Sequence, residues 1–292
     1  MFDTFQSRLE LTGILETVTA LRISAGRSTE PIGADLPVIK DAFERPFIPG
    51  ASFKGALRSR LESFLRGIDP SLAEDPADFT SRDRNRFIQQ LKEDFKGDDA
   101  GFTNALTSTK DLAALLFGTP WIASKFQVRD LTVDTDTWFG QYQERDGVAI
   151  DRDTETAAEG KLYDFQVVPA GTRFHFQVVV ENAKPKELGL LMIGLHQFEI
   201  ERIPLGGGRS RGLGVVKLSL NQMQWFAVEP KDGTSAKQRL LDYLQHLVEG
   251  QMQHYQLSES EFATLRQEWV TSLITYLQQC LPSPNETTAT EV

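Results

Sequence analysis

Apolar and polar residues alternate near the start of the chain. Residues 8–23 read RLELTGILETVTALRI, and this period of two predicts a β-strand. Glycine and proline then recur throughout residues 24–50, which is too often for any long element. We therefore expect an irregular loop there, and a loop of such length within a compact domain is usually functional.

The spacing of apolar residues becomes helical after this loop. It predicts a helix over 52–66 with Ser52 as its N-cap. Residues 71–110 are acidic and polar around a short helical patch, so we expect an inserted surface segment. The run DLAALLF at 111–117 predicts a short helix that ends at Gly118.

The second half of the chain returns to alternating patterns. Its predicted elements are, in order, a strand over 125–134, a polar loop over 139–160, a hairpin over 161–181 that turns at 169–171, a helix over 186–200, a glycine-rich loop over 205–214 and a strand over 215–226. Residues 235–281 predict two amphipathic helices, and a capping box of Ser258 and Glu261 opens the second one. We expect the last residues, PSPNETTATEV, to be frayed.

This order of elements predicts an α+β fold. Strand, helix, strand, hairpin, helix and strand follow the βαββαβ plan of ferredoxin-like domains, with insertions. We divide the chain into a main domain over 1–226, with the inserted helical segment at 71–110, and a helical C-terminal extension over 227–292.

The composition is that of an ordinary globular protein. Of 292 residues, 40% are hydrophobic and 25% are charged, which excludes wholesale disorder. The single cysteine, Cys280, excludes an internal disulfide and a multi-cysteine zinc site. No apolar run is long enough to span a membrane, and the first residues lack the pattern of a secretory signal. We expect a cytoplasmic protein that does not bind a membrane.

The formal net charge is −10, which argues against a protein that coats nucleic acid by charge alone. Two basic segments interrupt the acidic average. Residues 52–66 carry four bases and one acid, and residues 202–217 carry four bases and no acid. Such segments are commonly solvated charged faces, so their motifs must decide whether they bind a ligand.

The second basic segment contains the glycine-rich stretch GGGRSRGLG. It does not fit the dinucleotide pattern G-x-G-x-x-G, because Arg211 stands where the third glycine would fall, and the chain has no Walker A motif. Gly207 and Gly208 would let a phosphate approach the backbone, and Arg209 and Ser210 add a charged fork and a hydroxyl. A tight turn with surface arginines is the alternative.

The first basic segment lies on the predicted helix. Lys54 and Arg58 are four residues apart and share one face of that helix, away from its apolar stripe. Together with Ser52 at the helix N-terminus they predict an anion site. The alternative is an amphipathic helix whose bases are only solvated.

Two aspartates stand in the loop before this helix. Asp35 lies between a glycine and a proline, and Asp41 follows a lysine. A carboxylate there can bind a metal, move a proton or cap a turn. The four histidines are His175, His196, His246 and His254, and their spacing supports no catalytic triad or pair. We expect His175 and His196 to be packing or surface residues, while the spacing of His246 and His254 only weakly suggests a metal pair.

Taken together, the motifs resemble the RAMP superfamily, specifically the repeated backbone subunits of type III CRISPR interference complexes. Four stretches carry the resemblance in the order of the family: IGADLPVIKD at 32–41 followed by RPFIPGASFKGALRSRLE at 45–62, LLFG at 115–118 leading to KFQVRDLTV, DGVAIDRDTETAAEGKLYDFQVVPAGTRF at 146–174, and LGGGRSRGLGVV at 205–216.

The resemblance implies an RRM-like palm with a hairpin thumb within 125–181, and copies or paralogues stacked along a guide RNA. In nuclease-active members an Asp in the loop before the first helix cleaves the target RNA with a divalent metal, and Asp35 occupies that position. Lys54 and Arg58 match the guide-contacting helix of the family, and the segment 209–211 matches its glycine-rich loop. The implied partners are guide CRISPR RNA, complementary target RNA and other effector subunits, and the implied cofactor is Mg²⁺ or Mn²⁺.

Three functions follow from this resemblance. The leading one is an RNA-guided ribonuclease backbone subunit. The second is a structural guide-binding subunit in which Asp35 is catalytically silent. The third, a nuclease that processes guide precursors, usually relies on acid–base histidines, and no histidine lies near the glycine-rich loop in the sequence.

Overall fold

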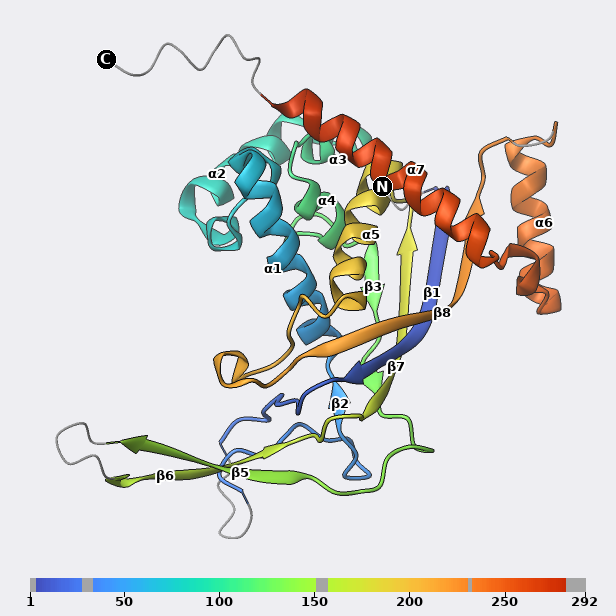
Figure 1. The fold of residues 1–292 in the computed structure, drawn as a ribbon. Helices are drawn as coiled ribbons and strands as arrows, with labels where there is room; N and C mark the ends of the chain where they lie inside the picture. Colours follow the sequence, from blue (N-terminus) through green and yellow to red (C-terminus); the bar gives the residue numbers. More distant parts are fainter. Residues whose placement is uncertain (1–3, 28–33, 151–156, 231–232, 282–292) are drawn as a thin grey trace.

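A four-stranded antiparallel sheet runs through the middle of the molecule (Figure 1). The computed structural model describes residues 4–27, 34–150, 157–230 and 233–281. The sheet consists of β1 (Ser7–Thr17), β3 (Phe126–Val128), β7 (Arg173–Glu181) and β8 (Val216–Ala227). Their spatial order, β3-β7-β1-β8, is the second, third, first and fourth strand of the sheet in chain order, which confirms the ferredoxin-like plan.

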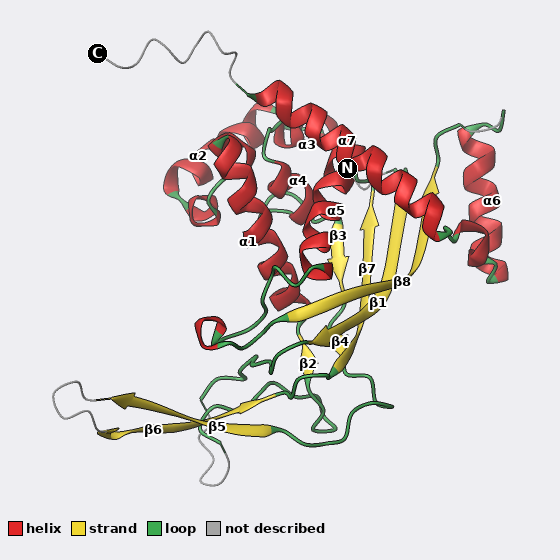
Figure 2. Ribbon diagram, in the orientation of Figure 1, coloured by secondary structure: helices red, strands yellow, loops and turns green. Residues whose placement is uncertain are grey.

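Two long helices cover one face of this sheet (Figure 2). They are α1 (Gly50–Ile68) and α5 (Pro185–Glu199). Residues of β1 alternate between buried and half-buried, as a strand with one covered face requires. Phe53 of α1 lies between Phe198 of α5 and Phe176 of β7, with ring centroids 4.5 and 5.1 Å apart. Full burial of such a side chain contributes about 1.5–3 kcal/mol, so these rings fasten both helices to the sheet.

The start of α1 differs from the prediction. The helix begins at Gly50 after Pro49, no side chain caps it, and Ser52 lies inside its first turn. The Gly50 N–H instead donates to Asp130 Oδ1 at 2.7 Å. The prediction of Ser52 as N-cap is therefore wrong, because a contact from a distant segment satisfies the helix start in place of a local side chain.

The predicted inserted segment is helical. It contains η1 (Pro70–Leu72), η2 (Pro76–Thr80), α2 (Arg82–Asp94) and α3 (Asp99–Thr107), and it leads into α4 (Leu112–Phe117). In α2 only Ile88 is buried and in α3 no residue is, so both helices lie at the surface. The short strands β2 (Phe47–Ile48) and β4 (Leu131–Thr132) pair beneath α1.

A long hairpin projects from one end of the sheet (Figure 1). It consists of β5 (Gln143–Ile150) and β6 (Ala157–Val167). The prediction of a loop over 139–160 is wrong, because a hairpin that stands away from the core needs no apolar face and so lacks the alternation that marks a strand. The predicted hairpin over 161–181 does not form either, since β7 pairs with β1 and β3 rather than with β6.

The predicted strand over 8–23 ends early, at Thr17. Beyond it the chain makes a single bridge from Leu21 to Val168 and then approaches the hairpin. This short connection brings the end of β1 and the base of β6 to the same place.

The C-terminal extension is helical, as expected. It consists of α6 (Ala236–Glu249), η4 (Met252–Tyr255) and α7 (Glu259–Cys280), and the capping box of Ser258 and Glu261 opens α7. Helix α7 crosses α5 (Figure 1), where a Cβ on Gly189 would lie 2.2 Å from the Trp269 carbonyl oxygen. A glycine is therefore required at this crossing. The predicted frayed end, 282–292, lies outside the described residues.

Among the described residues, no helix combines the length and the apolar character that crossing a membrane would require.

Candidate functional site

Asp35 lies on a short segment that pairs with the hairpin. Leu36 bridges Phe165 of β6 in a parallel sense. The Leu36 N–H donates to the Asp164 carbonyl oxygen, and the Gln166 N–H donates to the Leu36 carbonyl oxygen, both at 3.1 Å. The Asp164 N–H in turn donates to Asp35 Oδ2 at 3.3 Å. The backbone of β6 thus fixes where the Asp35 carboxylate stands.

Other carboxylates surround Asp35. Asp146 of β5 is directly opposite Asp164 in the hairpin. Desolvation, followed by the negative charges of Asp146 and Asp35, raises the pKa of Asp164. Because these groups repel one another when ionised, a cation that entered the cluster would be attracted to it.

The glycine-rich loop lies against the connection that follows β1. The Gly207 N–H donates to the Arg22 carbonyl oxygen at 2.8 Å. Gly206 has a φ of +73°, and a Cβ there would lie 2.1 Å from the same carbonyl oxygen. Only glycine allows this approach, so the glycines hold the loop down while the following turn, η3 (Arg209–Arg211), faces solvent.

The side chains of this turn are exposed. Arg209 Nε donates to the Gly206 carbonyl oxygen at 3.1 Å, and Arg211 Nη1 donates to the Tyr163 hydroxyl at 3.2 Å. The Ser210 hydroxyl has no hydrogen bond to the described residues and is open to solvent. Guanidinium groups held in this way keep further donors for an anion such as phosphate.

A small apolar cluster joins the segment of Asp35 to the glycine-rich loop and to the base of the hairpin. Its buried members are Ala20, Phe165, Val167 and Leu213, with Leu36 and Tyr163 packed against them. The cluster therefore contains residues from the loop of Asp35, the glycine-rich loop and the base of the hairpin. As a result, Asp35 and Arg211 are attached to Asp164 and Tyr163, which are consecutive residues of β6.

Three residues near this cluster were not singled out from the sequence. They are Tyr163, Asp164 and Arg22, whose guanidinium carbon lies 4.7 Å above the Phe165 ring. Tyr163 and Phe165 alternate with Asp164 in a predicted strand, which is the one signal that pointed to them. Their contacts with residues far away along the chain, 129 positions for Asp164 and 48 for Tyr163, leave no mark in the sequence.

The two bases predicted on α1 are engaged elsewhere. Lys54 Nζ donates to Ser124 Oγ at 2.7 Å, and burial together with the charge of Arg58 lowers the pKa of Lys54. Arg58 pairs with the buried Glu62 at 2.6 Å and donates to the Gly118 carbonyl oxygen. These contacts join α1 to the segment 118–126 and not to Asp35. RNA contacts by Ser52, Lys54 and Arg58 stay predictions.

Asp41 caps a turn. Its Oδ1 accepts the N–H groups of Phe43 and Arg45, and the Arg45 guanidinium pairs with Oδ2 at 2.8 Å. Desolvation alone would raise the pKa of Asp41, but these hydrogen bonds outweigh it and lower that pKa. Of the two loop carboxylates, Asp41 has a structural role, whereas Asp35 accepts only one weak hydrogen bond within the described residues.

The histidines lie away from the cluster. His175 is exposed on the sheet, and His196 pairs with Glu199 on the surface of α5, as expected. His246 and His254 do come together, with stacked rings 4.4 Å apart, and His246 Nδ1 hydrogen-bonds the Tyr255 hydroxyl. They form no group of three or more metal-binding side chains with other described residues.

The carboxylates at the hairpin base can supply part of a divalent metal site. Mg²⁺ and Mn²⁺ prefer oxygen ligands, and Mg²⁺ is commonly held by one or two carboxylates together with substrate phosphates. Asp35 and Asp164 provide carboxylates of this kind, and the pKa of Asp164 is raised by desolvation and then by neighbouring negative charges, which a cation would offset. The described residues contain no group of three or more His, Cys, Asp or Glu side chains that could hold a metal ion. Asp35 and Asp164 therefore fit a cation that takes a further oxygen ligand from RNA phosphate.

A family model and several curated proteins match the chain. The model of the RAMP superfamily matches residues 14–217. That range includes Asp35, the hairpin and the glycine-rich loop, and it ends before the C-terminal extension.

The similar proteins include four that are named CRISPR system Cms endoribonuclease Csm3. The one from Enterococcus italicus is 25% identical over 74% of this chain and 92% of its own length. The one from Methanocaldococcus jannaschii is 27% identical over 73% of this chain and 79% of its own length. The one from Mycobacterium tuberculosis is 28% identical over 83% of this chain and 97% of its own length.

Proposed function

The chain belongs to the RAMP superfamily, and from that premise we propose that it is a backbone subunit of a type III CRISPR RNA-guided effector complex. In this function it binds guide RNA, works beside other effector subunits that include copies or paralogues of itself, and cleaves complementary single-stranded target RNA. The relatives named as CRISPR endoribonucleases, which align along most of their own length, support the proposal.

One observation carries the proposal of cleavage. Asp35 and Arg211 come from segments far apart in the sequence and are attached to consecutive residues at the base of the hairpin. A carboxylate for the reaction and a guanidinium for the phosphate thus stand beside the same strand. An RNA strand that crosses the hairpin base would meet both groups.

The glycine-rich loop contributes RNA binding. Its exposed residues are Arg209, Ser210 and Arg211, and they can donate hydrogen bonds to phosphate oxygens without reading a base. Gly207 and Gly208 leave room for the phosphate to approach the backbone. Such contacts suit a subunit whose sequence specificity comes from base pairing between guide and target.

RNA carries its own nucleophile, the 2′-hydroxyl. Cleavage needs this oxygen to lie in line with the phosphorus and to lose its proton, and correct alignment alone can lower the barrier by several kcal/mol. The Asp35 carboxylate is suited to take that proton, while Arg211 is suited to hold the phosphate. With Asp35 to take the proton and Arg211 to hold the phosphate, the site can cleave RNA without a histidine base or a serine nucleophile.

A divalent cation fits this site as a cofactor. Asp35, with help from Asp164, would hold Mg²⁺ or Mn²⁺ together with the RNA phosphate, and when bound the cation would offset the negative charge that develops on that phosphate. We expect chelation of divalent metal to stop cleavage and added Mg²⁺ or Mn²⁺ to restore it.

The test is cleavage of a guide-complementary RNA by complexes that carry Asp35→Asn. We expect the rate to fall by at least about 100-fold, because a positioned carboxylate typically contributes this much, while guide and target binding stay unchanged. The matched control is Asp136→Asn, since Asp136 is an exposed carboxylate whose side chain makes no contact with the described residues. Asp41 is unsuitable as a control because it caps a turn.

A structural guide-binding subunit is the second candidate. It is favoured by the acidic surroundings of Asp35, since Asp146 and Asp164 would repel a phosphate if no cation were bound. If the Asp35→Asn complex cuts target RNA at the rate of the unmodified complex, the catalytic proposal is wrong and this second function replaces it.

A further inference from the structure

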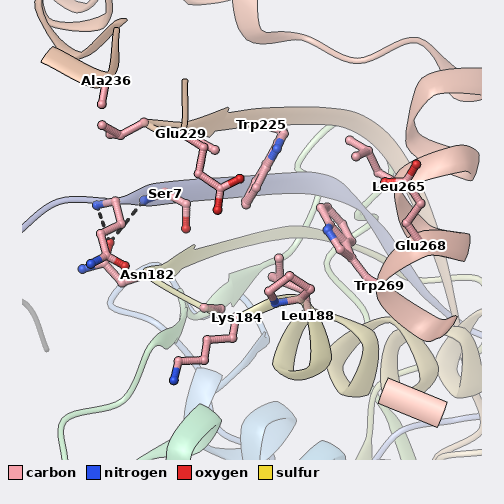
Figure 3. Close-up of a pocket in the computed structure, with 15 residues that line it drawn as sticks. Ser7, Asn182, Lys184, Leu188, Trp225, Glu229, Ala236, Leu265, Glu268 and Trp269 are labelled. Atoms are coloured by element: carbon pink, nitrogen blue, oxygen red, sulfur yellow. Dashed lines mark hydrogen bonds between the residues drawn. The ribbon is translucent and has the colours of Figure 1, made fainter. Parts of the chain in front are cut away.

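A cavity lies at the end of the sheet opposite the hairpin. It has a volume of about 640 Å³ and is bounded by the start of β1, the end of β7, the start of α5 and the end of β8, with α7 as its far wall (Figure 3). The eleven residues of β1 separate it from the hairpin end, a span of about 30 Å at the rise of a strand. The cavity is therefore distinct from the proposed RNA site.

Two tryptophans form its apolar floor. Trp225 of β8 and Trp269 of α7 meet edge to face with ring centroids 5.2 Å apart. Trp269 is buried and Trp225 is half-buried, so part of the Trp225 ring remains open to the cavity. An open indole face attracts organic cations, and tryptophan is the best of the aromatic side chains at this.

Two carboxylates stand beside these rings. Glu229 and Glu268 both line the cavity, and neither makes a hydrogen bond or ion pair with the described residues. In Figure 3 the Glu229 carboxylate points into the cavity beside Trp225, whereas the Lys184 ammonium is directed away from it. The combination of an open indole and unpaired carboxylates is complementary to a guanidinium or ammonium group.

The cavity continues into a neighbouring cavity of about 670 Å³, which shares Trp225, Ala227, Glu229 and Leu265 with it and extends to Tyr255 and Leu257. Together the two make a groove that combines apolar and polar side chains around an acidic centre. We call it the α7 groove. The arginine that lines it, Arg239, is already engaged, because its guanidinium donates to the Ala227 carbonyl oxygen at 2.8 Å.

We propose that the α7 groove binds a segment of a partner polypeptide through an arginine side chain of that partner. The guanidinium lies on Trp225 between Glu229 and Glu268. Apolar side chains that flank the arginine contact Leu188, Leu257 and Leu265 along the groove. A polypeptide fits better than a free polyamine because the groove is longer than its acidic centre and carries these apolar side chains beyond it. RNA is disfavoured, since unpaired carboxylates repel its phosphates.

The extension makes this surface possible. Leu265, Glu268 and Trp269 all lie on α7, which is beyond the residues that match the family model. The C-terminal extension thus supplies one wall of the groove, and the proposed contact stands whether or not the chain cleaves RNA.

The experiment uses the full chain labelled with 5-fluorotryptophan, whose four tryptophans give four ¹⁹F resonances. The probe is an acetylated, amidated peptide Gly-Leu-Arg-Leu-Gly, and its control replaces arginine with neutral, isosteric citrulline. We expect the arginine peptide to shift the resonances of Trp225 and Trp269, while Trp121 and Trp138, which lie outside the groove, stay unchanged. The citrulline peptide should shift none.

Variants test the carboxylates. We expect Glu229→Gln with Glu268→Gln to weaken peptide binding by at least about tenfold without lowering the melting temperature, because both side chains are exposed. The matched control is Glu249→Gln, an exposed residue of α6 outside the groove. Absence of shifts up to about 1 mM peptide, equal binding of the citrulline peptide, or unchanged binding by the double variant would each overturn the proposal. Tighter binding of spermidine than of the peptide would overturn the polypeptide as occupant.

Discussion

At the scale of single residues, the bases of this protein divide into two kinds. Arg209 and Arg211 are exposed and keep donors free, whereas Lys54 and Arg58 direct theirs to Ser124, Glu62 and Gly118. The two basic segments carry four bases each in the sequence, but their bases are not equally available to RNA.

This difference predicts how guide RNA binding responds to salt. Replacing Arg209 and Arg211 with Gln should weaken binding and reduce the slope of log K against log salt by about 0.7 for each phosphate that is no longer neutralised. Filter binding of a guide RNA over a range of salt concentrations measures both quantities. Unchanged affinity together with an unchanged slope would remove these arginines from the RNA interface.

The variant Lys54→Met is the control for the salt titration of the arginine variants. Because Lys54 Nζ is bonded within the fold, we expect this variant to melt at a lower temperature while the salt slope stays within about 0.3 of the unmodified value. A large decrease of the slope in Lys54→Met would show that Lys54 binds phosphate after all.

Single residues also differ in whether their place in the site could be predicted from the sequence. Asp35 and the glycine-rich loop were recognisable because each belongs to a local motif. Their meeting at Tyr163 and Asp164 was not, because it depends on hydrogen bonds between residues 129 positions apart in one case and 48 in the other. Contacts of that range leave no periodic signal.

At the scale of elements, the strands and helices that build the core were the predictable ones. Residues 186–200 and 111–117 emerged as α5 and α4 within one residue at either end, because a buried face imposes a clear apolar period. The hairpin of β5 and β6 was missed for the opposite reason, since residues 143–146 of β5 are exposed and show no apolar period. The helix start at Gly50 was missed because Asp130, eighty residues away, provides its partner.

One ion pair fastens the extension to the core. Arg266 of α7 forms two hydrogen bonds with the Glu199 carboxylate of α5, at 2.8 and 3.3 Å. Burial alone would raise the pKa of Glu199, but hydrogen bonds from Arg266 and His196 outweigh it and lower that pKa. A carboxyl with a lowered pKa stabilises the fold above its unfolded pKa, and this contribution disappears as the pH falls through the folded value.

Arg266→Gln should therefore have a pH-dependent cost. At neutral pH we expect a loss of about 1 kcal/mol, or roughly 3 °C in melting temperature, and the difference from the unmodified protein should shrink as the pH is lowered from 7 through the lowered pKa of Glu199 in the folded protein. Thermal unfolding across this pH range is the measurement. Lys237→Gln, at an exposed base without contacts to described residues, should have no effect at any pH, and a constant penalty for Arg266→Gln would contradict the assignment.

At the scale of the whole molecule, the two proposed sites occupy opposite ends of one sheet. The hairpin end presents exposed arginines, and the α7 groove presents unpaired carboxylates, in a chain whose net charge is −10. This separation lets an acidic protein bind RNA locally, because repulsion between charges about 30 Å apart is largely screened at physiological salt.

The isolated chain should be a poor nuclease. A carboxylate without a positioned strand leaves the in-line geometry to chance, so we expect unguided single-stranded RNA to be cut at least about 1000-fold more slowly than guided target in the assembled complex. Single-turnover cleavage of one labelled RNA with and without guide and partner subunits tests this. Comparable rates in both cases would show that the chain positions RNA alone.

The pairing of Leu36 with β6 has a consequence for how this protein can evolve. Leu36, the neighbour of Asp35, is held by main-chain hydrogen bonds with Asp164 and Gln166, and main-chain groups are the same whichever side chains surround them. Side chains around Leu36 can therefore be exchanged without removing the hydrogen bonds that set its register with β6. Lineages that diverge in these side chains keep the same backbone frame, and a carboxylate at position 35 stays at the same point beside the hairpin.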